Sequence, residues 1–392
     1  MAASALKIKA SSTEAVLLDM QAKGLWNGSF NGRESSLHQL APFIGKLKTG
    51  MVHSLIEHFS RKGEWICDSF SGCGVVPFQS VLLGRKAMAN DLSPYAICLT
   101  RAKLGAPTTV EQAESRCEEL IEYVERHWTR YDLRTVDRWV KSFFHPRTLK
   151  ETLAAFAFCR LRHDWFLAAC LCGILHHQRP GFLSYPASHM VPYLRTTLFP
   201  PDGFPHLYEY RAIAPRLMKK VRRAYRRTNL SNEWTADDYK VTQKNACHLP
   251  FADASADLIL TSPPYYDALD YARDNRLRLW FLGHPDWKAL NRRLTTSNSR
   301  YEQQMQMCLK EMYRVLKPQK ACLLVIGEVQ RNGETRDTGA VLGRLAHEVT
   351  SGGFALDCVV KDAIPDVRRS RRGTKTTRIE KILVLVKRPR KS

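Results

Sequence analysis

The sequence has no apolar run long enough to cross a bilayer. Its longest apolar stretch, Trp165 to Leu175, is about half of the roughly 20 residues that a spanning helix needs. The first 20 residues also lack an apolar segment followed by a small-residue cleavage site, so secretion is not predicted. We expect a cytoplasmic protein with no membrane partner.

The sequence also lacks the spacing of a metal site. None of its eleven cysteines forms a CxxC pair, and Cys170 and Cys172 are too close for an ordinary pair of zinc ligands. The histidines between His176 and His189 have no ligand spacing and no cysteine partner at a suitable distance. We therefore predict no metal site, and expect free, buried thiols in a reducing compartment.

Acidic residues are scarce relative to basic ones. The chain has 392 residues, with 60 Lys and Arg against 38 Asp and Glu, which gives a formal net charge of +22. A surplus of this size favours a polyanionic partner such as nucleic acid, although a generically basic protein would show it too. The 44% of hydrophobic residues is typical of a globular protein, and the length fits two domains or one domain with a large insertion.

The order of expected elements predicts an α/β fold with an open sheet. A strand over 64–68, a glycine-rich turn, a helix over 75–83 and a strand over 86–91 form a unit of the dinucleotide-binding type. Residues 106–235 interrupt this pattern with helices and loops, and the α/β pattern resumes near Tyr239. We thus expect an N-terminal arm (1–37), a main domain (38–105 and 236–392) and a mainly helical insertion after the second strand (106–235). Later elements are predicted at 257–261 (strand), 301–316 (helix, stopped by Pro318), 321–327 (strand), 339–349 (helix), 354–362 and 381–387 (strands).

A glycine pair marks a candidate ligand site at the end of the first strand. In the segment from Asp68 to Gly74, the pattern is Asp-x-Phe70-x-Gly72-x-Gly74, and the two glycines allow the backbone to approach a ligand closely. Asp91 follows 17 residues after Gly74, at the end of the next strand, where a carboxylate can accept hydrogen bonds from a ribose diol. A tight structural turn would also use such glycines.

A second motif follows the apolar strand over 257–261. Thr261-Ser262-Pro263-Pro264-Tyr265 has two prolines that fix the backbone and remove two N–H donors, so that carbonyl acceptors remain at the carboxyl edge of the sheet. An aromatic ring beside them can stack on a flat substrate. The turn therefore suits a substrate that donates N–H bonds, such as the exocyclic amine of a base.

Together these motifs resemble those of the S-adenosylmethionine-dependent DNA amino-methyltransferases. In that family D-x-F-x-G-x-G binds the cofactor and S/D/N-P-P-Y/F holds the target amine. Further similar segments are the region from His38 through Lys46 and the run Arg314-Val-Leu-Lys-Pro318. The resemblance covers roughly 38–104 and 240–390, and implies a Rossmann-like class I methyltransferase sheet. The chain departs from the family pattern at Cys73, at Val75, and at Asn245-Ala246, where an acid often faces the adenine ring.

The resemblance implies S-adenosylmethionine as cofactor and a base in double-stranded DNA as substrate. Thr-Ser-Pro-Pro-Tyr is more similar to cytosine-N4 enzymes; adenine-N6 methylation is the alternative, followed by RNA base methylation and by a catalytically inactive DNA-binding protein. Cytosine-C5 chemistry is disfavoured, because no proline is followed by the cysteine nucleophile of that family. A bacterial or phage-like, nucleoid-associated protein with a cognate restriction nuclease is the implied setting. The resemblance assigns catalysis to Ser262, Pro263, Pro264 and Tyr265, and cofactor binding to Lys46, Asp68, Phe70, Gly72, Gly74, Asp91, Asn245 and Ala246.

Basic side chains in the insertion and near the C-terminus are candidate DNA contacts. Extrusion of a base from the duplex requires a surface that holds the backbone. Arg179, in a loop with interleaved aromatic residues, is a candidate for base reading, because arginine pairs well with guanine. Either basic run could instead be a solvated face. The candidate backbone contacts are Lys219, Lys220, Arg222, Arg223, Arg226, Arg227, Arg371 and Arg372.

Overall fold

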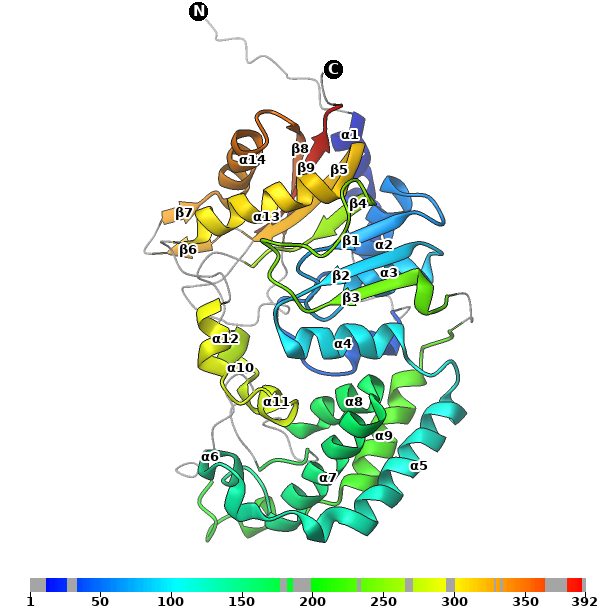
Figure 1. Cartoon of the computed structure of the whole chain (residues 1–392), viewed down its shortest axis with the longest axis vertical. Helices are drawn as coiled ribbons and strands as arrows, with labels where there is room; N and C mark the ends of the chain where they lie inside the picture. The colour runs from blue at the N-terminus through cyan, green and yellow to red at the C-terminus, as the bar shows by residue number, and fades with distance from the viewer. Residues whose placement is uncertain are drawn as a thin grey trace, which may run out of the picture.

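The protein is built around a seven-stranded sheet, as the computed structural model shows (Figure 1). The structure describes residues 12–26, 34–176, 182–185, 199–230, 234–264, 271–293, 300–327, 329–331, 334–363 and 379–389. The strand order is β3-β2-β1-β4-β5-β9-β8, and β9 alone runs antiparallel to its neighbours in this sheet. This order, with one reversed strand next to the last, is the class I methyltransferase fold, so the predicted α/β class is confirmed. The strands are β1 (Trp65–Asp68), β2 (Lys86–Asn90), β3 (Tyr239–Thr242), β4 (Ala256–Thr261), β5 (Leu316–Gly327), β8 (Phe354–Ala363) and β9 (Ile379–Lys387).

Helices cover both faces of the sheet. Successive side chains of a strand point to opposite faces, and apolar side chains on both faces must be buried. Ile66 of β1 belongs to the hydrophobic core on one face, and its neighbour Cys67 belongs to the core on the other. The first face carries α2 (Thr49–Phe59), α3 (Val75–Leu82) and α4 (Pro94–Leu104). The second carries α13 (Tyr301–Val315) and α14 (Thr338–Val349). The N-terminal arm contains a helix, α1 (Ser12–Ala22), which packs against β8.

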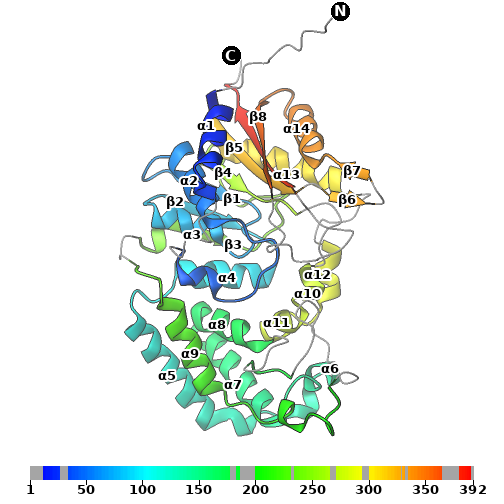
Figure 2. The same cartoon turned by 180° about the vertical axis from the view of Figure 1, so that it is seen from behind.

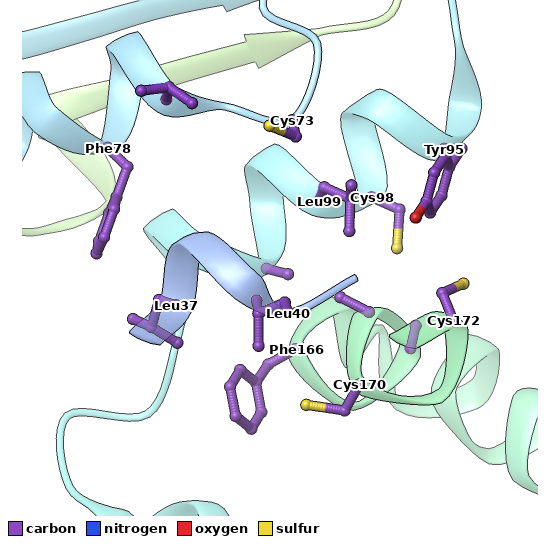
Figure 3. Packing of buried hydrophobic residues seen from close by; sticks show 14 of the residues in the cluster. Leu37, Leu40, Cys73, Phe78, Tyr95, Cys98, Leu99, Phe166, Cys170 and Cys172 are labelled. Carbon is purple, nitrogen blue, oxygen red and sulfur yellow. The ribbon is translucent and has the colours of Figure 1, made fainter. Parts of the chain in front are cut away.

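The insertion forms a helical module below the sheet in Figure 1. Its helices are α5 (Val110–His127), the short α6 (Arg138–Lys141), α7 (Pro146–Arg162), α8 (Trp165–Leu175) and α9 (Ile213–Tyr225). α8 packs against α4, and Leu40 lies beside Phe166 at this contact (Figure 3). Gly173 permits the approach, since a Cβ there would lie 2.0 Å from the Leu40 carbonyl oxygen. One continuous core therefore joins the module to the sheet.

Three features differ from the sequence-based expectations or were not anticipated. The helix expected to run to Leu316 and stop at Pro318 ends at Val315, and β5 already begins at Leu316. The pairing of β4 with β5 shifts register between Ala256 and Leu258, so Pro318 lies in an irregular stretch where its missing N–H breaks no regular ladder. The hairpin of β6 (Val329–Arg331) and β7 (Glu334–Arg336) was not predicted. Neither was the helical run of α10 (Tyr271–Asp274), α11 (Arg276–Phe281) and α12 (Trp287–Arg293).

In the part of the chain that the structure describes, no helix has both the length and the apolar character that crossing a membrane requires.

Candidate active site

The glycine turn connects β1 to α3 at the carboxyl edge of the sheet. Gly72 and Gly74 have φ angles of +49° and +73°, in the left-handed region that favours glycine. Gly74 also precedes α3 directly, and a Cβ there would lie 2.8 Å from Thr100 Oγ1 of α4. Both glycines of the motif are thus required by backbone conformation, and Gly74 is required by packing as well.

Asp91 lies against this turn from the end of β2. Its Oδ2 accepts a hydrogen bond from the Gly72 backbone N–H at 2.8 Å, and its Oδ1 accepts one from the Ser93 N–H at 2.8 Å. Burial raises the pKa of the Asp91 carboxyl, while these backbone hydrogen bonds act in the opposite direction. The Asp91 carboxylate therefore joins the end of β2 to the glycine turn that follows β1.

Asp68 joins the glycine turn to the second motif. The hydroxyl of Thr261 donates a 2.6 Å hydrogen bond to Asp68 Oδ1, and the Phe70 backbone N–H lies 3.1 Å from Thr261 Oγ1. The contact arises because β1 and β4 are neighbours, so that their last residues meet at one edge. Burial raises the pKa of Asp68 to about 7.

Ser262 begins the turn that follows β4. Its hydroxyl donates a 2.9 Å hydrogen bond to the carbonyl of Val325 in β5. Because the hydroxyl hydrogen is engaged by the Val325 carbonyl, the lone pairs of Ser262 Oγ are available to accept hydrogen bonds from a substrate. Ser262 and Pro264 line the cavity described next, and Pro263 between them is buried and is not among the lining residues. Tyr265 lies outside the described residues.

A cavity with an empty volume of about 1090 Å³, including its open mouth, brings these motifs together. Seven of the eight predicted cofactor residues line this cavity. The eighth, Gly74, is not a lining residue and packs against Thr100 of α4. Asn245 and Ala246, where the family often has an acid, are among the lining residues. The predicted residues at the wall are Lys46, Asp68, Phe70, Gly72, Asp91, Asn245, Ala246, Ser262 and Pro264.

Two lysines stabilise the segments around the glycine turn. Lys46 Nζ lies 2.5 Å from Glu34 Oε1 and 3.2 Å from the His38 carbonyl, which holds the N-terminal segment at the cavity. Lys103 of α4, which no sequence motif marks, is fully buried and donates a hydrogen bond to the Cys73 carbonyl. Burial lowers the pKa of Lys103 to about 8.

One wall of the cavity was not predicted from the sequence. Tyr271, Asn275 and Arg293, from the run α10–α12, line it opposite the sheet. They come from the stretch directly after the Ser-Pro-Pro-Tyr turn, and no spacing or motif distinguishes them. Proximity in sequence to that turn was the one available signal.

The candidate DNA contacts on and directly after α9 have mixed environments. Lys220 is held by the Gln39 carbonyl at 2.8 Å, and Arg222 forms a 2.7 Å ion pair with Glu114 of α5. Lys219, Arg223, Arg226 and Arg227 are exposed. Arg179, Arg371 and Arg372 lie outside the described residues.

Comparisons with known proteins return likenesses of structure only. No family model matches the chain, and no curated protein matches it. TrmN from Thermus thermophilus matches 88% of this chain at 11% identity and a TM-score of 0.34, and the match spans half the length of TrmN. A TehB-like SAM-dependent methyltransferase from Corynebacterium glutamicum matches 86% of this chain and 87% of its own at 10% identity and a TM-score of 0.33.

A third structure shares more sequence over a shorter stretch. It is a candidate DNA modification methylase from Thermus thermophilus complexed with S-adenosyl-L-methionine; the match has 22% identity and a TM-score of 0.22, and covers 36% of this chain and 51% of that one. At such TM-scores these likenesses carry no argument about substrate. The fold assignment rests on the strand order: this is the fold of S-adenosylmethionine-dependent methyltransferases.

Proposed function

We propose that the protein transfers a methyl group from S-adenosylmethionine to the exocyclic N4 amine of cytosine in DNA. The observation that carries the proposal is that one cavity contains both the glycine turn with Asp91 and the acceptor turn at Ser262. A cofactor site and an amine site that share one cavity are what a direct methyl transfer requires.

The residues at the wall fit S-adenosylmethionine. Asp91, at the end of β2, is placed to accept hydrogen bonds from the ribose hydroxyls, and the side-chain amide of Asn245 offers a donor and an acceptor for the adenine edge. When bound, the cofactor supplies an electrophilic methyl group on a sulfonium. The protein's own contribution is then to hold and orient the two reactants.

Ser262 and the Pro263 carbonyl are the proposed acceptors for the two amine protons. Their hydrogen bonds orient the amine nitrogen so that its lone pair faces the methyl carbon, and positioning supplies most of the rate. In this arrangement the amine nitrogen would take the methyl group, the cofactor would leave as the neutral thioether, and the extra amine proton would pass to solvent. No thiol participates, so Cys73, although it lines the cavity, is not a nucleophile in this proposal.

The target atom lies inside the duplex stack, so the nucleotide must be extruded into the cavity. We assign stacking on the extruded base to Tyr265, and backbone or base contacts to the helical module and to the C-terminal basic run. Adenine N6 is the alternative target, because its exocyclic amine makes the same two hydrogen bonds. RNA is a further alternative, since a structured RNA offers the same amines and the same charge.

Product analysis tests the proposal. Duplex DNA methylated by the purified protein is digested to nucleosides, which are identified by mass spectrometry against standards, with Ser262→Ala as the control protein. N4-methylcytosine is the expected product. N6-methyladenine would keep the mechanism and change the base, whereas 5-methylcytosine would contradict it, because that chemistry needs a cysteine nucleophile.

A further inference from the structure

The helical run α10–α12 forms the cavity wall opposite the sheet and links that wall to the helical module (Figures 1 and 2). In α11, Arg278 donates hydrogen bonds to the carbonyls of Cys172 and His176, at 3.1 and 3.3 Å. Trp280 Nε1 donates to Asp137 Oδ2 at 2.6 Å. α11 is therefore fixed to the module, and it fixes in turn the α12 helix that packs against it.

The run α10–α12 has more basic than acidic residues. Residues 271–293 include six Lys and Arg but only two Asp. Of the two acids, Asp274 is buried, and Asp286 accepts a hydrogen bond from the Ala289 N–H at the start of α12. Three basic side chains of α12 are exposed, and none of them forms an ion pair with a carboxylate in the described part of the chain: Lys288, Arg292 and Arg293.

Arg293 lines the cavity, whereas Lys288 and Arg292 do not. One of the three charges therefore lies at the cavity wall, and the other two lie on the exposed surface of the same helix. Exposed, unpaired cations in this position are available to an anionic partner that enters the cavity from solvent. The cavity carboxylates Asp68 and Asp91 do not take these cations as partners, because the Thr261 hydroxyl and backbone N–H groups already donate hydrogen bonds to them.

We infer that α12 binds the phosphates that flank the extruded nucleotide, an inference that rests on the proposed function. A base that reaches Ser262 keeps its sugar and both neighbouring phosphates, which must remain at the rim of the cavity. Lys288 and Arg292 hold these phosphates from outside, and Arg293 holds the one nearest the cavity. Such contacts position the strand and are independent of base sequence.

The test uses Lys288→Gln/Arg292→Gln in the full-length protein and leaves Arg293 in place, because Arg293 borders the cofactor site. The matched control is Arg61→Gln/Lys62→Gln, which removes the same charge from two exposed residues just before β1, at the opposite edge of the sheet. Affinity for a mixed-sequence DNA duplex is measured over a range of salt concentrations. Calorimetric titration with S-adenosylmethionine and thermal unfolding show that each variant is folded.

We expect the log–log salt slope of the α12 variant to fall by about 2, close to 0.9 for each lost phosphate contact, with an affinity loss on the order of tenfold or more. The control should keep the wild-type slope, and both variants should bind the cofactor normally. An unchanged slope in the α12 variant, or an equal fall in both variants, would overturn the inference while leaving the proposed function intact. Wild-type protein that shows no salt-dependent binding to DNA would instead overturn the proposed function and this inference with it.

Discussion

The Thr261 hydroxyl, at the end of β4, donates a 2.6 Å hydrogen bond to Asp68 Oδ1, at the end of the neighbouring strand β1. Asp68 begins the glycine motif and Thr261 begins the acceptor turn, although 193 positions separate them in the chain. The contact is buried at both ends. Together with the hydrogen bond from the Phe70 N–H to Thr261 Oγ1, it holds the glycine turn and the proposed amine-binding turn in one relative position.

The pKa of Asp68 predicts a fall in stability with rising pH. Its folded value of about 7 lies above the ordinary 3.8, so the folded state binds more protons between these values and its stability falls as the pH rises through that window. The difference corresponds to at most about 4 kcal/mol.

Asp68→Asn removes this titration. Between pH 5 and pH 8, urea unfolding should show the wild-type free energy of unfolding falling relative to that of the variant. Parallel pH profiles for the two proteins would show that Asp68 is ionised at ordinary carboxyl pKa in the folded state.

Asp91→Ala should weaken S-adenosylmethionine binding by about 1.5–3 kcal/mol, the range for a hydrogen bond to a charged group. The same change also leaves the Gly72 and Ser93 N–H groups without their carboxylate acceptor, so thermal unfolding must accompany the calorimetric titration. Asp132→Ala, on an exposed turn of the module, is the control. If the folded Asp91→Ala variant binds S-adenosylmethionine with wild-type affinity, the assignment of Asp91 to ribose binding is wrong.

The parts of the site that the sequence predicts are those with local rules. Glycines at positive φ, a carboxylate at a strand end and a double proline after an apolar strand each follow from backbone geometry within a few residues. The wall at Tyr271, Asn275 and Arg293 has no such rule, because tertiary contacts of α11 with the module position it. The start of β5 was predicted too late for a related reason. Pro318 does exclude a continuing helix, but the pairing of β5 with β4 decides where the strand begins.

Lys220 of α9 and the pair Arg226 and Arg227, which directly follows this helix, should give opposite results. Lys220 is partly buried and donates a hydrogen bond to the Gln39 carbonyl, and this burial lowers its pKa. Lys220→Ala should therefore lower the free energy of unfolding by about 1–2 kcal/mol and leave the salt slope of DNA binding unchanged. Arg226→Ala/Arg227→Ala removes two exposed charges and should lower the slope by about 2 while stability stays constant. A slope that responds to Lys220 alone would reverse these assignments.

Ser262→Ala separates chemistry from cofactor binding. The Ser262 hydroxyl is bonded to Val325 of β5, so its oxygen is held in place as an acceptor before any substrate arrives. Its loss leaves the Pro263 carbonyl as the remaining acceptor, and we expect methyl transfer to slow by roughly 10–1000-fold, as for the loss of one oriented hydrogen bond in an active site. Single-turnover rates with saturating DNA measure this loss, and calorimetric affinity for S-adenosylmethionine should be unchanged. Cys73→Ser is the matched control, since Cys73 lines the same cavity and takes no part in amine transfer in the proposed mechanism. Equal losses in both variants would indicate a general disturbance of the cavity, and a loss confined to Cys73→Ser would point to a thiol mechanism instead.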